Sequence, residues 1–195
     1  DDFASGLACA AGVAHKSTLD LRGQLSGHPQ TSAQALAQLL RVSTALKSIT
    51  LDGSTLPVKQ LKGTEPVETL DLSEKGLCVV SGIVIAKLIE GNAVVTNLDP
   101  SGHRLGDEGG KAIAEALKVN AVLTTLDLKR NGLDADAGKA LAEALKVNAV
   151  LTEVDVGYNS LKEEEALAIV RAVRPRDKLT SLGLGSSKIG PTGAK

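Results

Sequence analysis

The sequence predicts an α/β solenoid: a curved horseshoe of repeated strand–helix units, with a parallel sheet on the concave face and helices on the convex face. The pattern L-x-x-L-x-L begins at residues 16, 46, 67, 95, 123, 151 and 179, and every step from residue 67 onward is 28 residues long. Residues 110–124 and 138–152 are identical at fourteen of fifteen positions. Only 1% of the 195 residues are aromatic, so the core must consist of Leu, Ile, Val and Ala in regular layers. One unit cannot bury its own apolar face, but stacked units can.

Each unit combines two hydrophobic periods, as in "LTTLDLKRNGLDADAGKALAEALKVNAV" (residues 123–150). Its first part places Leu126 and Leu128 in alternation with polar residues, which predicts a short strand. Its second part places Ala137, Leu141 and Leu145 four residues apart, which is the apolar stripe of an amphipathic helix. Helices are wider than strands, so the stack must curve with the strands inside.

The helix ends can be predicted as well. Asp134 and Asp136 stand near a helix start, where negative charge suits the helix dipole. Asn148 follows the last apolar residues of that helix, and Asn120 follows those of the preceding helix. We expect both asparagines to adopt the left-handed conformation that ends a helix.

Three places depart from the repeat. Residues 46–66 form a unit of 21 residues with two prolines, which predicts a strand followed by an irregular or extended convex segment. Pro100 replaces the last Leu of its strand, so it keeps apolar bulk inside but removes one N–H donor from the ladder. Glu165 stands where other units have a small residue, which predicts a helix that starts differently or a local gap.

We assign the whole chain, residues 1–195, to one domain of about seven repeats. Residues 1–15 are expected to form a partial helix or an N-terminal flank, and the last repeat is incomplete. Neither end has a polar capping element, which solenoids need for solubility. We therefore expect a longer protein or a partner at an uncapped solenoid end, the alternative being an end that is simply left bare.

The 28-residue units resemble the ribonuclease-inhibitor type of leucine-rich repeat, L-x-x-L-x-L-x-x-N-x-L-x-x-x-G-x-x-x-L-x-x-x-L plus five residues. This type also builds the repeat domains of NOD-like receptors and Ran GTPase-activating proteins. The resemblance covers roughly residues 16–195 and implies the fold, but it is nearly silent on function. The Asn at the ninth position, which in the family ties the loop to neighbouring backbone, is present only as Asn131 and Asn159. Other residues stand there in the remaining units, so we expect less uniform loops: Gln24, Ser54, Lys75, His103 and Ser187.

Bulk composition argues against several classes of protein. The formal net charge is −1, whereas a dedicated nucleic-acid binder would have a basic face. Cys9 and Cys78 are far apart and form no CxxC pattern. No apolar run reaches the roughly 18 residues of a membrane span, and the start "DDFASG" is acidic rather than the basic start of a signal peptide. We therefore predict an intracellular protein that does not bind nucleic acid.

No set of residues with catalytic chemistry converges. The stretch "GDEGGK" (106–111) invites comparison with a phosphate-binding loop, but that pattern needs Gly at Leu105 and Ser or Thr at Ala112. The three histidines fall at different repeat phases: His15, His28 and His103. We predict no enzymatic activity, no metal site and no cofactor.

The segment "RAVRPRDK" (171–178) gathers four basic residues near the expected end of a helix. Positive charge is favourable at a helix C-terminus in any case. Phosphate binding is the alternative interpretation of this cluster.

An acidic residue recurs at the fifth position of the strand pattern: Asp20, Asp71, Asp99, Asp127 and Asp155. Side chains there point to the concave face, and neighbouring strands lie about 4.8 Å apart. Carboxylates so close should resist full ionisation. They predict a site for a basic partner or a bound cation. The alternative is a solubilising feature inherited from one duplicated ancestor, in which Thr69, Asn97 and Thr125 donate hydrogen bonds.

The near-identical repeats differ at positions on the concave face and its loop rim. There we expect four side chains to lie near one another: Lys129, Arg130, Glu153 and Tyr158. Arg and Tyr are residue types that anchor interfaces. The sequence therefore offers a candidate contact patch, although ordinary solvated rim residues are an equal alternative.

These observations favour a non-enzymatic protein–protein interaction scaffold, or a subunit of a larger assembly, that binds a protein partner through its concave face. The alternatives are a regulator of a small GTPase, an enzyme that uses the Asp column, and the sensor repeat module of a larger receptor.

Overall fold

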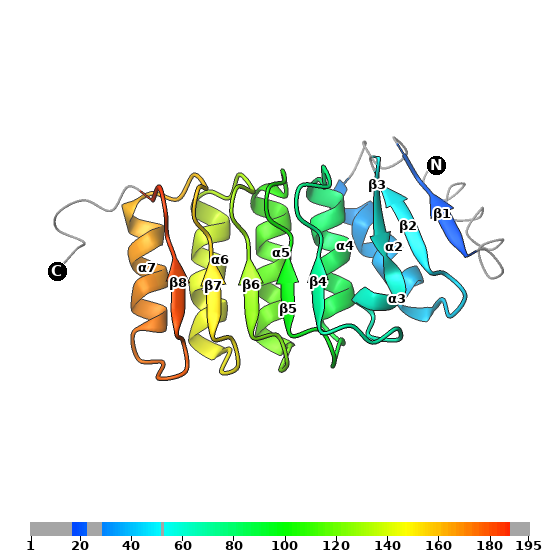
Figure 1. The fold of residues 1–195 in the computed structure, drawn as a ribbon. Helices are drawn as coiled ribbons and strands as arrows, with labels where there is room; N and C mark the ends of the chain where they lie inside the picture. Colours follow the sequence, from blue (N-terminus) through cyan, green and yellow to red (C-terminus); the bar gives the residue numbers. More distant parts are fainter. Residues whose placement is uncertain (1–16, 23–28, 52, 188–195) are drawn as a thin grey trace.

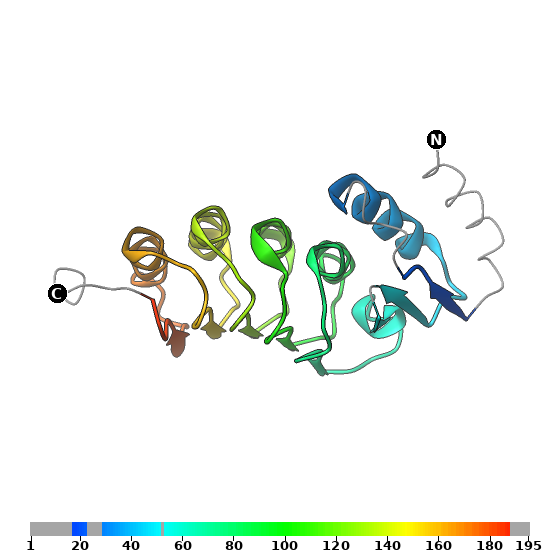
Figure 2. The same ribbon diagram turned by 90° about the horizontal axis from the view of Figure 1, so that it is seen from above.

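The computed structural model describes residues 17–22, 29–51 and 53–187. Its larger part is a five-stranded parallel sheet whose strands follow chain order: β4 (Thr69–Asp71), β5 (Asn97–Asp99), β6 (Thr125–Asp127), β7 (Glu153–Asp155) and β8 (Ser181–Gly183). Four helices alternate with these strands: α4 (Val79–Ile89), α5 (Gly106–Val119), α6 (Ala135–Val147) and α7 (Glu163–Val173). The helices stand side by side in one layer and leave the other face of the sheet uncovered (Figures 1 and 2). We name that uncovered face the open sheet face.

The buried residues confirm the predicted periods. Leu126 and Leu128 of the β6 unit are 1% and 0% exposed, and Ala137, Leu141 and Leu145 of α6 are all 0% exposed. The corresponding Leu, Ile, Val and Ala side chains of the other repeats join the same continuous core. Burial of each Leu side chain contributes about 2 kcal/mol to the free energy of unfolding. A core with almost no aromatic residues can therefore still stabilise the stack of repeats.

The N-terminal part forms a second sheet of three strands, β1 (Thr18–Asp20), β2 (Ser48–Leu51) and β3 (Ser54–Pro57). The predicted strand of the short unit is β2, which pairs in parallel with β1. The rest of residues 46–66 differs from the predicted irregular segment, because β3 turns back and pairs with β2 in antiparallel orientation. Only one helical turn, α3 (Val58–Leu61), fits into the remaining length. Helix α2 (Pro29–Val42) therefore packs directly against α4 and continues the helix layer.

The predicted left-handed helix ends are wrong, because the asparagines there have extended backbones and buried side chains. Asn120 has φ −71° and ψ 125°, and Asn148 has φ −70° and ψ 120°. Asn148 Nδ2 donates to the carbonyls of Leu117 (2.8 Å) and Asn120 (3.3 Å) in the preceding repeat. Its Oδ1 accepts from the N–H groups of Val150 (3.1 Å) and Leu151 (2.9 Å).

The same four-bond arrangement recurs in two other repeats. Asn120 Nδ2 donates to the carbonyls of Ile89 (2.8 Å) and Asn92 (3.2 Å), and its Oδ1 accepts from two N–H groups of its own turn. Asn92 repeats the pattern on the preceding turn. All three side chains are at most 5% exposed. We name Asn92, Asn120 and Asn148 the asparagine ladder, and it ties successive turns to one another.

A second set of bonds ties the loops at the opposite ends of the strands. Asn159 Nδ2 donates to the Leu128 carbonyl (2.9 Å), 31 residues earlier, and its Oδ1 accepts from Leu133 N–H (3.1 Å), 26 residues earlier. His103 reproduces both bonds at the same offsets: Nε2 lies 2.6 Å from the Leu72 carbonyl, and Nδ1 accepts from Leu77 N–H (3.3 Å). These partners require the neutral imidazole with its proton on Nε2. His103 therefore has the same role in its loop as Asn159 has in its own.

Asn131 is the less regular member of this set. Its Nδ2 donates to the Pro100 carbonyl (2.8 Å), 31 residues earlier, but its buried Oδ1 has no partner among the described residues. Instead, Gly106 N–H bonds to the main-chain carbonyl of Asn131 (3.0 Å). The loop of Asn131 therefore differs from those of His103 and Asn159, as the predicted lack of uniformity requires. Gln24, one of the irregular positions, lies outside the described residues.

The expectation for Pro100 is confirmed. The residue is buried, and the β5–β6 pairing has two registered pairs where the other neighbouring strands of this sheet have three. Leu72, Leu128 and Val156 each donate an N–H to the next repeat's strand carbonyl at 2.7–2.9 Å. Proline cannot make this bond, so the carbonyl of Asp127 lacks the donor that its counterparts have.

We expect Pro100→Leu to raise the free energy of unfolding by about 0.5–1 kcal/mol, because the added ladder hydrogen bond outweighs the loss of proline's constraint on the unfolded chain. Urea denaturation of the two proteins measures the difference. A lower stability for the Leu variant would show that the ring itself is the better fit at this position.

Of the two alternatives predicted for Glu165, a different helix start is confirmed and a local gap is wrong. The Glu165 carboxylate caps the start of α7, whereas the Asp134 side chain caps the start of α6. Helix α7 begins at Glu163, 28 residues after the start of α6 at Ala135, so its phase is unchanged. Glu165 is only 2% exposed, and its Oε2 accepts from Lys162 N–H (3.1 Å) at the helix start. No gap results, because the stem of Glu165 lies against Gly138, where an added Cβ would come within 2.8 Å of it.

Candidate functional site

Of the predicted Asp residues, Asp20 lies apart, in β1 of the N-terminal sheet. The other four lie on the open sheet face, where Asp71 is in register with Asp99 and Asp127 with Asp155. Each carboxylate accepts a hydrogen bond from the main-chain N–H two residues further on, at 2.8–2.9 Å: Ser73, Ser101, Lys129 and Gly157. These donors are main-chain N–H groups, joined at Asp71 by the Ser73 hydroxyl (2.7 Å), and not the side chains of Thr69, Asn97 and Thr125. The column shapes the turn after each strand as well as charging the face.

The expectation that these carboxylates resist ionisation is wrong at Asp71. The hydroxyl and then the N–H of Ser73 hold the pKa of the Asp71 carboxyl below its usual value. Further along the sheet, the Lys129 ammonium lies 2.8 Å from Asp127 Oδ2 and 3.5 Å from Asp155 Oδ2. The hydrogen bond and charge of Asp127, followed by the charge of Asp155, raise the pKa of Lys129. A side-chain cation thus already lies beside the two carboxylates where a bound cation was considered.

Arg130 and Tyr158 form the most distinctive contact of the site. The Arg130 guanidinium carbon lies 5.2 Å from the centre of the Tyr158 ring, which is a cation–π geometry. The ring is 55% exposed and also lies over the main chain of Gly185, where an added Cβ would be 3.3 Å from Cε2. The aromatic ring is therefore held between two neighbouring repeats while much of its surface faces solvent.

Both residues occupy an unusual backbone position. The third residue after each strand of the large sheet has positive φ: 52° at Glu74, 76° at Gly102, 54° at Arg130, 56° at Tyr158 and 62° at Ser186. Left-handed backbone costs a non-glycine residue about 1 kcal/mol. Gly102 shows that this turn accepts glycine, so Arg130 and Tyr158 place large side chains where the fold alone favours none.

The structure brings together only part of the predicted patch. Lys129, Arg130 and Tyr158 lie with Asp127 and Asp155 at the rim where β6 and β7 end, and we name these five residues the rim cluster. Glu153 begins β7 and is exposed, but among the described residues it forms no ion pair with Lys129 or Arg130. Asp71 and Asp99 lie on the neighbouring strands β4 and β5, outside the cluster.

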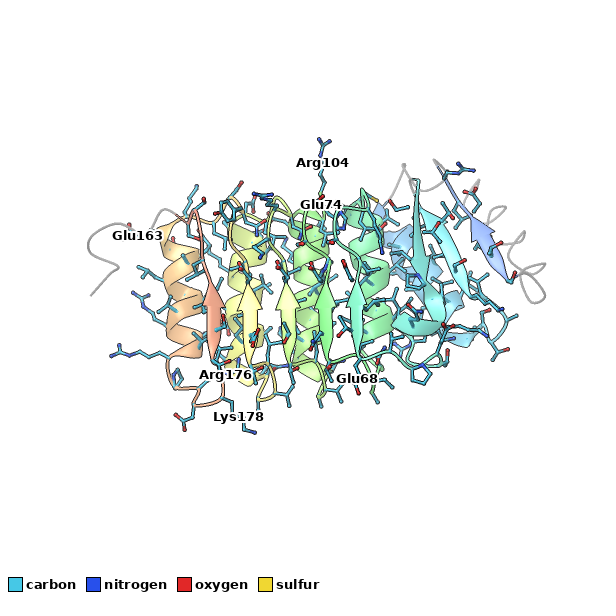
Figure 3. The ribbon with its side chains drawn as sticks, viewed as in Figure 1. Glu68, Glu74, Arg104, Glu163, Arg176 and Lys178 are labelled. Carbon is cyan, nitrogen blue, oxygen red and sulfur yellow. The ribbon has the colours of Figure 1, made fainter. Side chains whose placement is uncertain are left out.

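Two rim residues were not foreseen from the sequence. Glu74 has the same left-handed backbone as Arg130 and is exposed, and Arg104 extends outward from the same edge of the solenoid (Figure 3). The sequence did contain a signal for Glu74, because this charged residue stands at the same position of its repeat as Gly102 does in the next. Arg104 is one of the irregular loop residues beside His103 and had no such signal.

Within residues 17–22, 29–51 and 53–187, no group of three or more His, Cys, Asp or Glu side chains could hold a metal ion. In the same part of the chain, no helix is both long and apolar enough to cross a bilayer.

Comparisons with known proteins agree with this architecture. A family model described as "Leucine Rich repeat" matches residues 91–114 and 119–142. Among solved structures, one titled "Leiomodin-1 Actin-Binding Site 2 (ABS2)" is similar, with a TM-score of 0.59 and 22% sequence identity over 65% of this chain and 75% of that chain. No curated protein matches the sequence. At this identity the likeness concerns the fold.

Proposed function

Because the chain is a leucine-rich repeat protein, we propose that it is a non-enzymatic interaction module, a scaffold or a subunit of a larger assembly, that binds a protein partner through the open sheet face. The observation that carries this proposal is the rim cluster, in which Arg130 and Tyr158 are displayed from left-handed backbone positions. We also propose the ribonuclease-inhibitor type for its repeats, on the 28-residue unit with a full helix.

The fold itself needs no large side chain at these two positions. Gly102 fills the equivalent place in the preceding repeat without strain, whereas Arg130 and Tyr158 each cost about 1 kcal/mol of backbone energy. Their stacking returns about 0.5–1 kcal/mol at an exposed site. Folding alone therefore gains little from this pair, which supports a role in recognition.

Rigidity is the second support. The Tyr158 ring lies between the Arg130 guanidinium and the Gly185 main chain, and Lys129 is held between two carboxylates. Side chains that are already ordered lose less conformational entropy when a partner binds. Arg and Tyr are also the types that most often dominate interface energies.

Charge suggests the chemistry of the partner. Asp71, Glu74 and Asp99 give the β4–β5 part of the open sheet face a negative character, while Arg130 adds a cation beside the aromatic ring at the β6–β7 rim. A partner that fits both parts presents basic side chains to the first and a carboxylate or an aromatic ring to the second. The actin-binding title of the similar leiomodin-1 structure supports an interaction role in general and does not identify actin as the partner here.

The test uses substitutions whose effects on folding and on binding have opposite signs. Arg130→Gly and Tyr158→Gly relieve left-handed backbone, so each should leave the free energy of unfolding unchanged or raise it by up to about 1 kcal/mol. The double variant should nevertheless lower partner recovery in an affinity capture by at least about tenfold, the loss of one modest interface anchor.

The matched control is Glu143→Gly with Lys146→Gly, which removes an exposed ion pair from the outer side of α6. This control should lose some stability, because glycine weakens a helix, yet it should recover the partner as the wild-type chain does. Equal recovery by the Arg130/Tyr158 double variant and the wild type would reject the rim cluster as the binding site.

A further inference from the structure

The edge where helices end and strands begin differs in character from the rim. We name it the turn edge, and it runs along consecutive repeats at the opposite ends of the strands from the rim cluster (Figure 1). Val119 at the end of α5 and Val147 at the end of α6 are each 63% exposed. Val42 at the end of α2 is 76% exposed, and Ala121 and Ala149 are exposed in the adjoining turns.

The fold does not account for these valines. The core stripe of α5 and α6 ends at Leu117 and Leu145, both 0% exposed, and the asparagine ladder supplies the hydrogen bonds of the turns. Apart from Tyr158, the valines 42, 119 and 147 are the exposed large apolar side chains of the described residues. Because these valines lie on the same edge, they form an apolar strip and are not isolated exposed residues scattered over the surface.

Positive charge on the turn edge rises sharply in the repeat that contains α7. Helices α5 and α6 each end with one lysine that is paired to the glutamate three residues earlier, Lys118 with Glu115 (2.6 Å) and Lys146 with Glu143 (2.5 Å). At α7 the copied turn "KVNAV" is replaced by "RPRDK", and four cations occur within residues 171–178 with one acid, Asp177. None of these four forms an ion pair among the described residues. A helix end carries only about half a negative charge, so four cations exceed what it needs.

Arg176 separates the structural part of this cluster from the rest. It stands 28 residues after Asn148, at the next position of the asparagine ladder, and its Nη2 donates to the Leu151 carbonyl (2.7 Å). Arg176 thereby ties its turn to the preceding repeat, as the ladder asparagines do. Arg171, Arg174 and Lys178 are exposed, and their side chains make no such bond to the preceding repeat. Figure 3 shows Lys178 extending from the turn edge near Arg176.

We propose that the turn edge from α5 to α7 docks on an anionic membrane surface. Arg171, Arg174 and Lys178 would contact lipid headgroup phosphates, and Val119 and Val147 would enter the interfacial layer beside them. The turns of successive repeats follow one another along a single edge of the solenoid (Figure 1), so the cations and the valines can contact the same membrane surface. A free phosphate would use only the cations, which is why the pairing with exposed valines favours a lipid surface. The rim cluster, at the opposite ends of the strands, would then face away from the membrane.

The experiment is sedimentation of the full chain with vesicles of phosphatidylcholine alone and with about 30% phosphatidylserine, at about 50 mM and 200 mM salt. Binding is expected only to the anionic vesicles, and more weakly at the higher salt. Arg171→Ser with Arg174→Ser and Lys178→Ser should lower the vesicle partition coefficient by at least about tenfold, since each surface cation is worth roughly fivefold. Val119→Ser with Val147→Ser should lower it less, by about threefold or more.

The matched control removes three exposed cations away from the turn edge, two in the loops at the opposite edge and one in the first half of α6: Lys75→Ser, Arg104→Ser and Lys139→Ser. It has the same net charge as the cluster variant and should bind vesicles nearly as the wild type does. Equal losses in the two triple variants would reduce the effect to net charge and overturn the proposal. Failure to bind anionic vesicles at the lower salt would also overturn it and would leave an acidic protein as the ligand of the cluster. Partner capture through the rim is measured without vesicles, so the two proposals can fail separately.

Discussion

Replacing Asn148 with Ala should lower the free energy of unfolding by about 3–4 kcal/mol, which is a large loss for a single buried polar residue. The substitution leaves the carbonyls of Leu117 and Asn120 and the N–H groups of Val150 and Leu151 without their partner, in a site where Asn148 is 5% exposed. Chemical denaturation followed by circular dichroism measures the loss. Asn148→Asp should be at least as damaging, because a carboxylate oxygen would then face two carbonyls.

The neighbouring residue supplies the control. Val147→Ala changes an exposed side chain in the same turn and should shift stability by no more than about 0.5 kcal/mol. Similar losses for Asn148→Ala and Val147→Ala would mean that the turn tolerates change in general and that the asparagine ladder is not what joins the repeats.

The second large effect is expected at His103. His103→Leu keeps apolar volume but leaves the Leu72 carbonyl and the Leu77 N–H unpaired in a site that is 6% exposed, so it should cost about 2–4 kcal/mol. His103→Asn should restore stability to within about 1 kcal/mol of the wild type, because Asn159 makes the same two bonds at the same offsets.

The comparison of the two variants decides the role of the side chain. Thermal and chemical denaturation of the Leu and Asn variants should give clearly separated midpoints. If both variants were equally destabilised, the imidazole would matter for its shape in the loop rather than for its donor and acceptor, and the equivalence with Asn159 would be lost.

The parts of this fold that the sequence predicts are those that repeat locally. The alternation at Leu126 and Leu128 and the stripe through Leu141 and Leu145 depend on neighbours within a few residues, so one repeat already contains the signal. The missing donor of Pro100 follows from its own covalent structure, and the structure confirms it. The contact between Arg130 and Tyr158 followed from comparing one repeat with the next.

The features that the sequence does not reveal depend on bonds between repeats. Asn120 and Asn148 are of a residue type that commonly ends helices through local contacts, but their side chains bond to carbonyl groups 28 and 31 residues earlier. The role of His103 could not be predicted from its own repeat, because its partners are main-chain groups of the preceding repeat. Glu165 stands where other repeats have a small residue, and it fits because Gly138 of the neighbouring helix leaves room for its side chain.

The same distinction limits prediction of the site. The column of carboxylates was visible as a period, but its turn-forming hydrogen bonds and the position of Lys129 between Asp127 and Asp155 required the three-dimensional arrangement. Glu153 was grouped with Tyr158 because both vary between repeats. Sequence variation alone could not show that Glu153 begins the strand while Tyr158 follows its end.

Hydrogen–deuterium exchange of the chain with and without a captured partner tests the binding account most directly. Residues 127–131 and 155–159 contain the amides of Lys129, Arg130, Gly157 and Tyr158, whose hydrogen bonds lie at the rim. These two segments should exchange more slowly in the complex, while the outward-facing parts of α5, α6 and α7 keep their rates. Slower exchange confined to the helices or the turn edge, with residues 127–131 and 155–159 unchanged, would contradict the account.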